Sequence, residues 1–172
     1  LFCMPKSLIC WIPFSQKDTK HLLTMTVDLA ELAVLMSDHK ESMRYALDGI
    51  KLAQKEKDKG AESKLLFCIG ENKWQLSFNE VGIMTNFDKA IKLLQGTSSK
   101  LEMAMLSYFY GMKMDYLLND SRSKEALEVG LKREKLLKDI AKLPEKTKGF
   151  LDLQYTYLYA KNVVYLLSGR KV

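Results

Sequence analysis

The sequence has few cysteine, proline, glycine and histidine residues. Its 172 residues include three cysteines, three prolines, nine glycines and two histidines. Three thiols cannot all pair with one another, and the gap between Cys3 and Cys10 matches no common zinc-ligand spacing. Neither a disulfide framework nor a zinc module is therefore indicated. A chain of this length is long enough to bury a core without such staples.

Motifs that carry chemistry are also scarce. His21 and His39 have no second ligand at a metal-binding spacing, and there is no glycine-rich phosphate loop or dinucleotide fingerprint. The carboxylate pair Glu125 and Glu128 is flanked by lysines, which is typical of exposed surface. We expect no catalytic residue, no cofactor and no metal. An all-helical enzyme of unknown type stays an alternative, because a catalytic set assembled from distant residues leaves no sequence pattern.

Charge of one sign is not concentrated anywhere. The chain has 27 Lys and Arg against 21 Asp and Glu, a formal net charge of +6. The two most charged stretches, residues 40–64 and 120–148, interleave both signs. This pattern favours solvated helix faces over a stripe that follows phosphates, so we expect no nucleic-acid binding by this domain.

The first residues stand apart from the rest. Residues 1–14 are apolar but contain two prolines and a lysine, and they are too short to cross a bilayer. We treat residues 1–16 as a segment of uncertain role: the remnant of a signal peptide, a piece of an upstream element, or a cap. The first alternative would place the protein outside the cytoplasm, in the periplasm, and the others in the cytoplasm. No membrane span is expected.

From residue 17 onward the apolar residues recur every three or four positions, which predicts helices. Asp38 with Glu41, and Ser99 with Glu102, are capping pairs that begin helices, whereas Gly60 is expected to end one. The first predicted helix carries the apolar stripe from Leu22 to Leu35, and the second begins at Asp38. The other five predicted helices are Ala61 to Met84, Phe87 to Gln95, Ser99 to Leu118, Arg122 to Leu143 and Lys148 to Leu167. No segment alternates as a strand does. Seven helices with short loops predict antiparallel pairs.

The turns between helices share a pattern of a polar break followed by a small residue. The clearest case is Thr85-Asn86-Phe87-Asp88-Lys89-Ala90, which resembles the turn of the tetratricopeptide repeat, usually written Gly-Asp-Tyr-Glu-Lys-Ala. Trp74 stands at the family's tryptophan position. Small residues stand at or near the family's close-packing positions: Ala30, Ser42, Gly49, Ala90 and Ala126. The resemblance covers about Leu23 to Val172. It implies an all-α repeat domain over residues 17–172, with about seven helices stacked as antiparallel pairs in a right-handed solenoid.

The end of the chain resembles an interrupted repeat. Residues 165–172 are similar to the turn inside a fourth unit, with Gly169 in the glycine slot, and no second helix follows. We expect the sequence to be a piece of a longer protein, truncated within that unit. An unpaired final helix would leave an apolar face that promotes self-association.

The resemblance also implies a binding surface. In tetratricopeptide arrays the first helix of each pair lines a concave groove that holds a peptide or partner segment. The positions carried over as binding residues are Glu31, Asn72, Gln75, Asn79, Tyr108 and Asp115. The three carboxamides are three and four residues apart, which places them on one helix face, and each can both donate to and accept from a peptide backbone. The predicted function is non-catalytic binding of a protein or peptide.

The segment from Ala126 to Ala160 resembles, more weakly, tetratricopeptide modules of bacterial two-component sensors and helix-turn-helix regulators. This likeness implies the sensory or regulatory part of a larger signalling protein, whose kinase or other output domain would lie outside this chain. The alternative is a peptide-responsive transcription regulator that lacks its DNA-binding domain.

Overall fold

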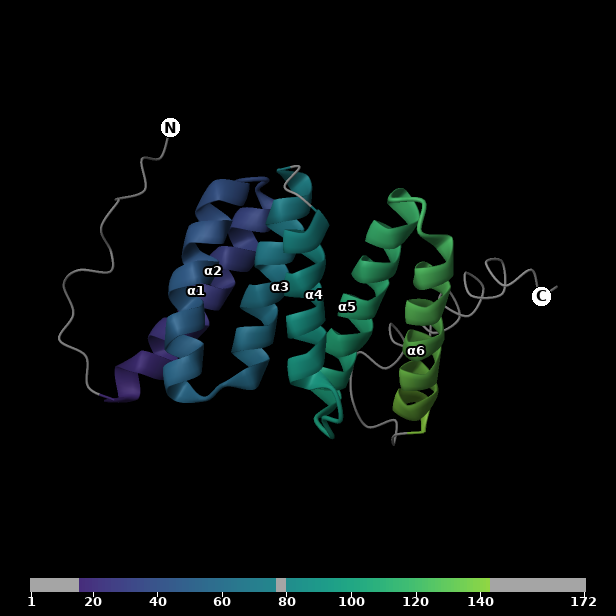
Figure 1. Cartoon of the computed structure of the whole chain (residues 1–172). Coiled ribbons are helices and arrows are strands. Elements are labelled where there is room, and N and C mark those ends of the chain that lie inside the picture. Colours follow the sequence, from purple (N-terminus) through teal and green to yellow (C-terminus); the bar gives the residue numbers. More distant parts are fainter. Residues whose placement is uncertain (1–15, 77–79, 143–172) are drawn as a thin grey trace.

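Six α-helices account for most of the residues that the computed structural model describes, residues 16–76 and 80–142 (Figure 1). They are α1 (Gln16–Leu35), α2 (His39–Glu56), α3 (Lys59–Gln75), α4 (Glu80–Leu94), α5 (Lys100–Asn119) and α6 (Ser123–Ala141). The described ranges contain no strand, so the prediction of an all-α chain is confirmed. The predicted seventh helix, residues 148–167, lies outside them.

The helices follow one another in space in the order of the sequence (Figure 1). Each packs against the next along the chain, and α1 also packs against α3. The extensive pairings are α1 with α2, α2 with α3, α3 with α4, and α5 with α6, whereas α4 with α5 and α1 with α3 are less extensive. The connections between helices are short, so each helix must run antiparallel to the one before it and pack beside it.

Three of the turns between helices have the same geometry. Each has a non-glycine residue with a positive φ angle just after the helix: Ser37, Lys57 and Ser121. After α2, the Lys57 amide donates to the Gln54 carbonyl at 3.3 Å and the Asp58 amide to the Ala53 carbonyl at 2.9 Å. This pair of bonds is the Schellman motif, which satisfies carbonyls left open at a helix end. The prediction that Gly60 ends this helix was wrong, because Lys57 takes the left-handed conformation and Gly60 lies in the first turn of α3.

Both predicted helix starts are capped as expected. The Asp38 carboxylate accepts from the Glu41 amide at 3.2 Å, and the Ser99 hydroxyl accepts from the Glu102 amide at 3.5 Å. The Glu102 carboxylate bonds the hydroxyl of Thr97. A third cap, Asp58, begins α3 in the same way as Asp38 begins α2.

The predicted third and fourth helices are divided in the wrong place. The break expected at Thr85 and Asn86 lies inside α4, and α3 ends instead at Gln75. The polar pair is accommodated because each side chain bonds a carbonyl one turn back: Thr85 donates to Val81 at 2.6 Å and Asn86 to Gly82 at 2.5 Å. The tetratricopeptide-like turn is therefore helical here.

The corrected boundary between α3 and α4 also changes the position assigned to Trp74. It lies near the end of α3 instead of early in the first helix of a pair, so the assignment to the family's tryptophan position was wrong. Its ring packs edge-on against Tyr116 of α5, with the centroids 5.3 Å apart.

The core of the described residues has two large clusters, one on either side of α3, and a small third one of Leu137 and Ile140 on α6. One joins α1, α2 and α3 and comprises Leu23, Val27, Ala30, Ala46, Ala53, Leu65, Cys68 and Ile69. The other extends from Phe67 of α3 through Phe87 and Phe109 to α6. Because α3 is buried on two sides, its apolar residues do not follow a single stripe.

Small residues lie where helices approach most closely, as predicted. Ala30, Ser42, Gly49, Ala90 and Ala126 are all buried. The Ser42 hydroxyl donates to the Ala30 carbonyl at 2.8 Å, which ties α2 to the backbone of α1. A β-carbon on Gly49 would meet Leu65 at 2.9 Å. A larger side chain at such a position would force the helices apart.

Candidate ligand-binding groove

Alternate helices line a hollow of about 480 Å³, called the groove below. Its walls come from the first helix of each pair: Glu31, Val34 and Leu35 of α1; Lys64, Phe67, Cys68 and Glu71 of α3; and Ala104, Met105, Tyr108 and Phe109 of α5. On α3 the lining residues recur every three or four positions, so they lie on one face of the helix. Residues from across more than half of the described chain thus meet at one surface.

Aromatic rings form the floor of the groove. Phe67 stacks on Phe109 with centroids 4.2 Å apart and on Phe87 with centroids 4.9 Å apart. Tyr108 lies above them, tilted, 5.6 Å from Phe67 and 51% exposed. At the rim, Leu35 is 82% exposed. The groove therefore offers a fixed apolar floor together with apolar side chains that still face solvent.

The charged groups of the groove are two carboxylates and one ammonium. Lys64 Nζ lies 3.4 Å from Glu31 Oε1, so these two charges form an ion pair. The side chain of Glu71, two turns after Lys64 on α3, has no ion pair or hydrogen bond among the described residues. Burial raises the pKa of the Glu71 carboxyl, and nearby His39 opposes that shift. The groove thus has an excess of negative charge.

Two other groups report the same environment. Burial, and then the charges of Glu31 and Glu71, raise the pKa of the Cys68 thiol to about 12. Burial and the same two carboxylates also raise the pKa of Tyr108 to about 12. Both groups stay protonated at neutral pH, so the Cys68 thiol is a poor nucleophile. The groove offers apolar contact and negative charge but no activated nucleophile.

The predicted role of Asn72 is not supported by its position. This side chain is fully buried between α3 and α2, away from the groove. Its Nδ2 donates to Ser42 Oγ at 2.7 Å, and its Oδ1 lies 3.0 Å from His39 Nδ1. Both ends of the carboxamide are thus used within the protein, because a buried amide must be hydrogen-bonded. Asn72 holds helices together.

Of the other predicted binding residues, two line the groove, two lie outside its lining, and one is not among the described residues. Glu31 and Tyr108 both line the groove. Gln75 is exposed but lies outside the lining. Asp115, two turns after Tyr108 on α5, is exposed, and partial burial of its carboxyl raises its pKa while Arg133 opposes this. Asn79 lies outside the described residues.

Sequence reasoning missed most of the α3 contribution to the groove. Lys64, Phe67 and Glu71 were not assigned, because the second pair was aligned on Trp74. A usable signal was present: Lys57-Asp58 repeats the pattern of Ser37-Asp38, and both aspartates cap a helix. Alignment on those caps places the start of α3 correctly.

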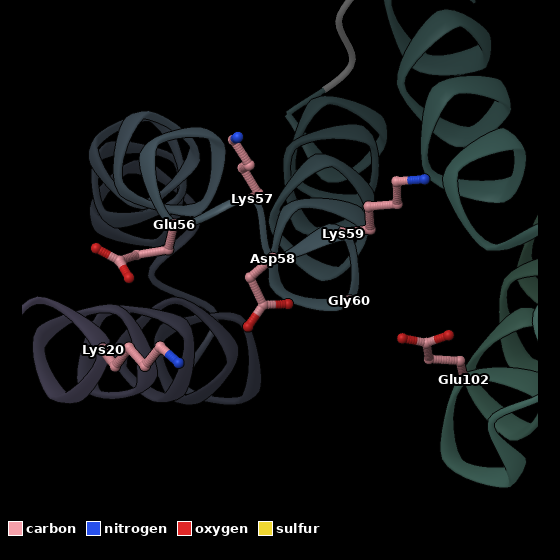
Figure 2. A pocket seen from close by; sticks show the side chains of 7 residues that line it. All are labelled: Lys20, Glu56, Lys57, Asp58, Lys59, Gly60 and Glu102. Atoms are coloured by element: carbon pink, nitrogen blue, oxygen red, sulfur yellow. The ribbon is translucent and has the colours of Figure 1, made fainter.

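A second hollow, of about 430 Å³, lies at the turn between α2 and α3 (Figure 2). Its lining is almost wholly charged, with Lys20, Glu56, Lys57, Asp58, Lys59 and Glu102 around Gly60. Figure 2 shows the three lysines pointing in different directions. The Asp58 carboxylate already accepts from the Ala61 amide at 2.9 Å, so the start of α3 is occupied. Because the lining mixes positive and negative side chains and these do not point toward a common centre, this hollow indicates no ligand.

Within residues 16–76 and 80–142, no three His, Cys, Asp or Glu side chains are grouped to hold a metal ion. None of the helices in these ranges combines the length and apolarity that crossing a bilayer requires. Comparison with protein-family models, with curated proteins and with solved structures found no match. The groove is therefore the feature of the described residues that points to a function.

Proposed function

We propose that this protein is a non-catalytic module that binds a peptide or a segment of another protein in the groove. The observation that carries the proposal is the origin of the lining: α1, α3 and α5 each contribute side chains to one hollow. An extended chain laid across three helices can contact each in turn, as peptides do in helical-repeat proteins. This arrangement supports a tetratricopeptide-like solenoid of helix pairs, which we propose as the finer description of the fold.

The side chains that face the groove suit binding better than catalysis. Tyr108 and Leu35 leave apolar surface in solvent, and aromatic residues are frequent centres of binding energy at protein interfaces. Cys68, the thiol in the lining, is buried and held protonated. A place within a larger signalling protein stays a prediction, as does a role in transcription.

The proposal is tested by selection of binders from a displayed library of random peptides, followed by calorimetry with the best one. Tyr108→Ala is expected to weaken binding at least about 10-fold, because truncation of a central aromatic removes a large contact. The matched control is Leu47→Ala on α2, which removes a similarly exposed apolar side chain outside the groove. Its affinity should equal that of the unaltered protein.

Two results would count against a binding groove. One is the failure of the library to yield any saturable binder. The other is a set of binders whose affinity is unchanged by Tyr108→Ala in a variant with unchanged thermal unfolding.

A further inference from the structure

We infer that the groove selects a peptide segment in which a lysine or arginine stands beside an aliphatic or aromatic side chain. This inference rests on the proposed function and names the chemistry of its ligand. It is carried by the charge of the lining together with the aromatic floor.

The charge of the groove is opposite to the charge of the chain. The whole sequence carries a formal net charge of +6, yet the lining holds two carboxylates and a single lysine. That lysine, Lys64, is already paired with Glu31. Glu71 forms no ion pair or hydrogen bond among the described residues, and the group that acts on its charge is His39, so the groove is complementary to a cation.

The position of Glu71 makes that complementarity strong. Its carboxylate is partly desolvated, and a charge-assisted hydrogen bond formed there is stronger than one formed in open water. Asp115, two turns beyond Tyr108 on α5, lies outside the lining and close to the charge of Arg133. The preference for a basic side chain therefore depends on Glu71.

The aromatic floor of the groove is the reason to expect an aliphatic or aromatic side chain beside the basic one in the ligand. The Phe67 and Phe109 rings are stacked and buried, and they present little polar surface. Tyr108 is half exposed, so its ring can contact both an apolar side chain and the cation beside it. Val34, Leu35 and Met105 extend the apolar wall on either side.

The test uses three short labelled peptides with the same leucines, alternating with arginine, glutamine or glutamate. Fluorescence anisotropy is measured with the full chain at about 0.05 M and about 0.3 M salt. We expect the arginine peptide to bind about 10-fold more tightly than the glutamine peptide at low salt. The glutamate peptide should bind most weakly, and the preference should shrink at high salt.

Variants assign the preference to the groove. Glu71→Gln is expected to remove most of the preference for arginine while leaving the affinity for the glutamine peptide unchanged. Glu128→Gln makes the same change in net charge at an exposed position on α6, and should leave the preference intact. Tyr108→Ala should weaken all three peptides.

The outcomes separate this inference from the proposed function. Suppose that a library-selected peptide binds through Tyr108, but the arginine, glutamine and glutamate peptides bind equally or the glutamate peptide binds best. The inferred ligand chemistry is then wrong, and the proposed binding function stands. If no peptide binds by either method, the function itself fails. A preference that survives Glu71→Gln would also overturn the inference.

Discussion

Asn72 Oδ1 lies 3.0 Å from His39 Nδ1, across the interface between α3 and the start of α2. The amide group of Asn72 is already used, since Nδ2 donates to Ser42 Oγ. With the carboxamide in this orientation, its Oδ1 accepts and His39 therefore carries a proton on Nδ1. Ser42 in turn donates to the Ala30 carbonyl, so one buried network ties α3 through α2 to α1.

Removal of that network should be costly. Asn72→Ala leaves a cavity and removes a partner from both Ser42 and His39, and we expect the free energy of unfolding to fall by about 2–3 kcal/mol. Urea unfolding followed by circular dichroism measures the loss. Gln75→Ala, on the same helix but exposed, should change stability by less than about 0.5 kcal/mol. Equal effects of the two substitutions would show that the network adds nothing.

Two glycines of α3 should respond oppositely to the same substitution. A β-carbon on Gly70 would lie 2.8 Å from two ring atoms of buried Phe87, whereas one on Gly60 would meet nothing closer than 3.4 Å. Gly70→Ala should therefore destabilise by about 1–3 kcal/mol despite the better helix propensity of alanine. Gly60→Ala should stabilise slightly or be neutral. Thermal unfolding of both variants tests the pair, and a stabilised Gly70→Ala protein would contradict the close approach of α3 to α4.

The three left-handed turn residues offer a way to stabilise the chain. Ser37, Lys57 and Ser121 have φ angles of 59°, 56° and 58°, a conformation that glycine adopts without steric cost. We expect each substitution by glycine to raise the free energy of unfolding by about 0.5–1 kcal/mol. Lys55→Gly is the control, because Lys55 is helical and should lose about 0.5–1 kcal/mol. If Lys57→Gly and Lys55→Gly destabilised the protein equally, the Schellman geometry after α2 would be wrong.

Cys68 should be protected from thiol reagents. Burial raises its pKa from the usual 9.0 to about 12, so at pH values near neutral almost no thiolate is present in the folded protein. In a Cys3→Ser, Cys10→Ser background, we expect a disulfide reagent to react with Cys68 many-fold faster in the urea-unfolded chain than in the folded one. Equal rates would contradict the burial of this side chain.

The same shift predicts a loss of stability in alkali. Between about pH 9 and pH 12 the unfolded chain releases the Cys68 proton while the folded chain retains it, so the free energy of unfolding falls as pH rises through this window. Below it both states are protonated and the contribution is constant. Cys68→Ala should flatten the alkaline part of the stability profile measured by urea unfolding. An unchanged profile would indicate that the thiol does not titrate differently in the two states.

The existence and order of most helices could be predicted because the signals are local. Asp38 and Ser99 lie at helix starts because their side chains bond amides within the same turn of chain. Small residues such as Ala30 and Ser42 were recognised as close contacts because only small side chains fit between adjacent helices. The break predicted at Thr85 was wrong, because bonds to carbonyls one turn back let polar residues remain helical.

The groove could be predicted only in part. Glu31 and Tyr108, carried over from the groove positions of the tetratricopeptide repeat, do line the groove. Asn72 looks equally exposed in the sequence, because polarity does not reveal whether a carboxamide meets solvent or a buried hydroxyl. Only the packing of α3 against α2 decides that it is interior.

An all-α chain and its capped helix starts could be deduced from the sequence, because each depends on neighbours a few positions away. The small residues at helix contacts came from the resemblance to the tetratricopeptide repeat, since partners such as Ala30 and Ser42 are twelve positions apart. Tertiary structure decided which face of α3 lines the groove, why Glu71 forms no ion pair or hydrogen bond among the described residues, and why Asn72 is used internally. Those outcomes depend on residues up to tens of positions apart, such as Ser42 and Asn72. A helix with two buried sides carries no single stripe from which its orientation could be deduced.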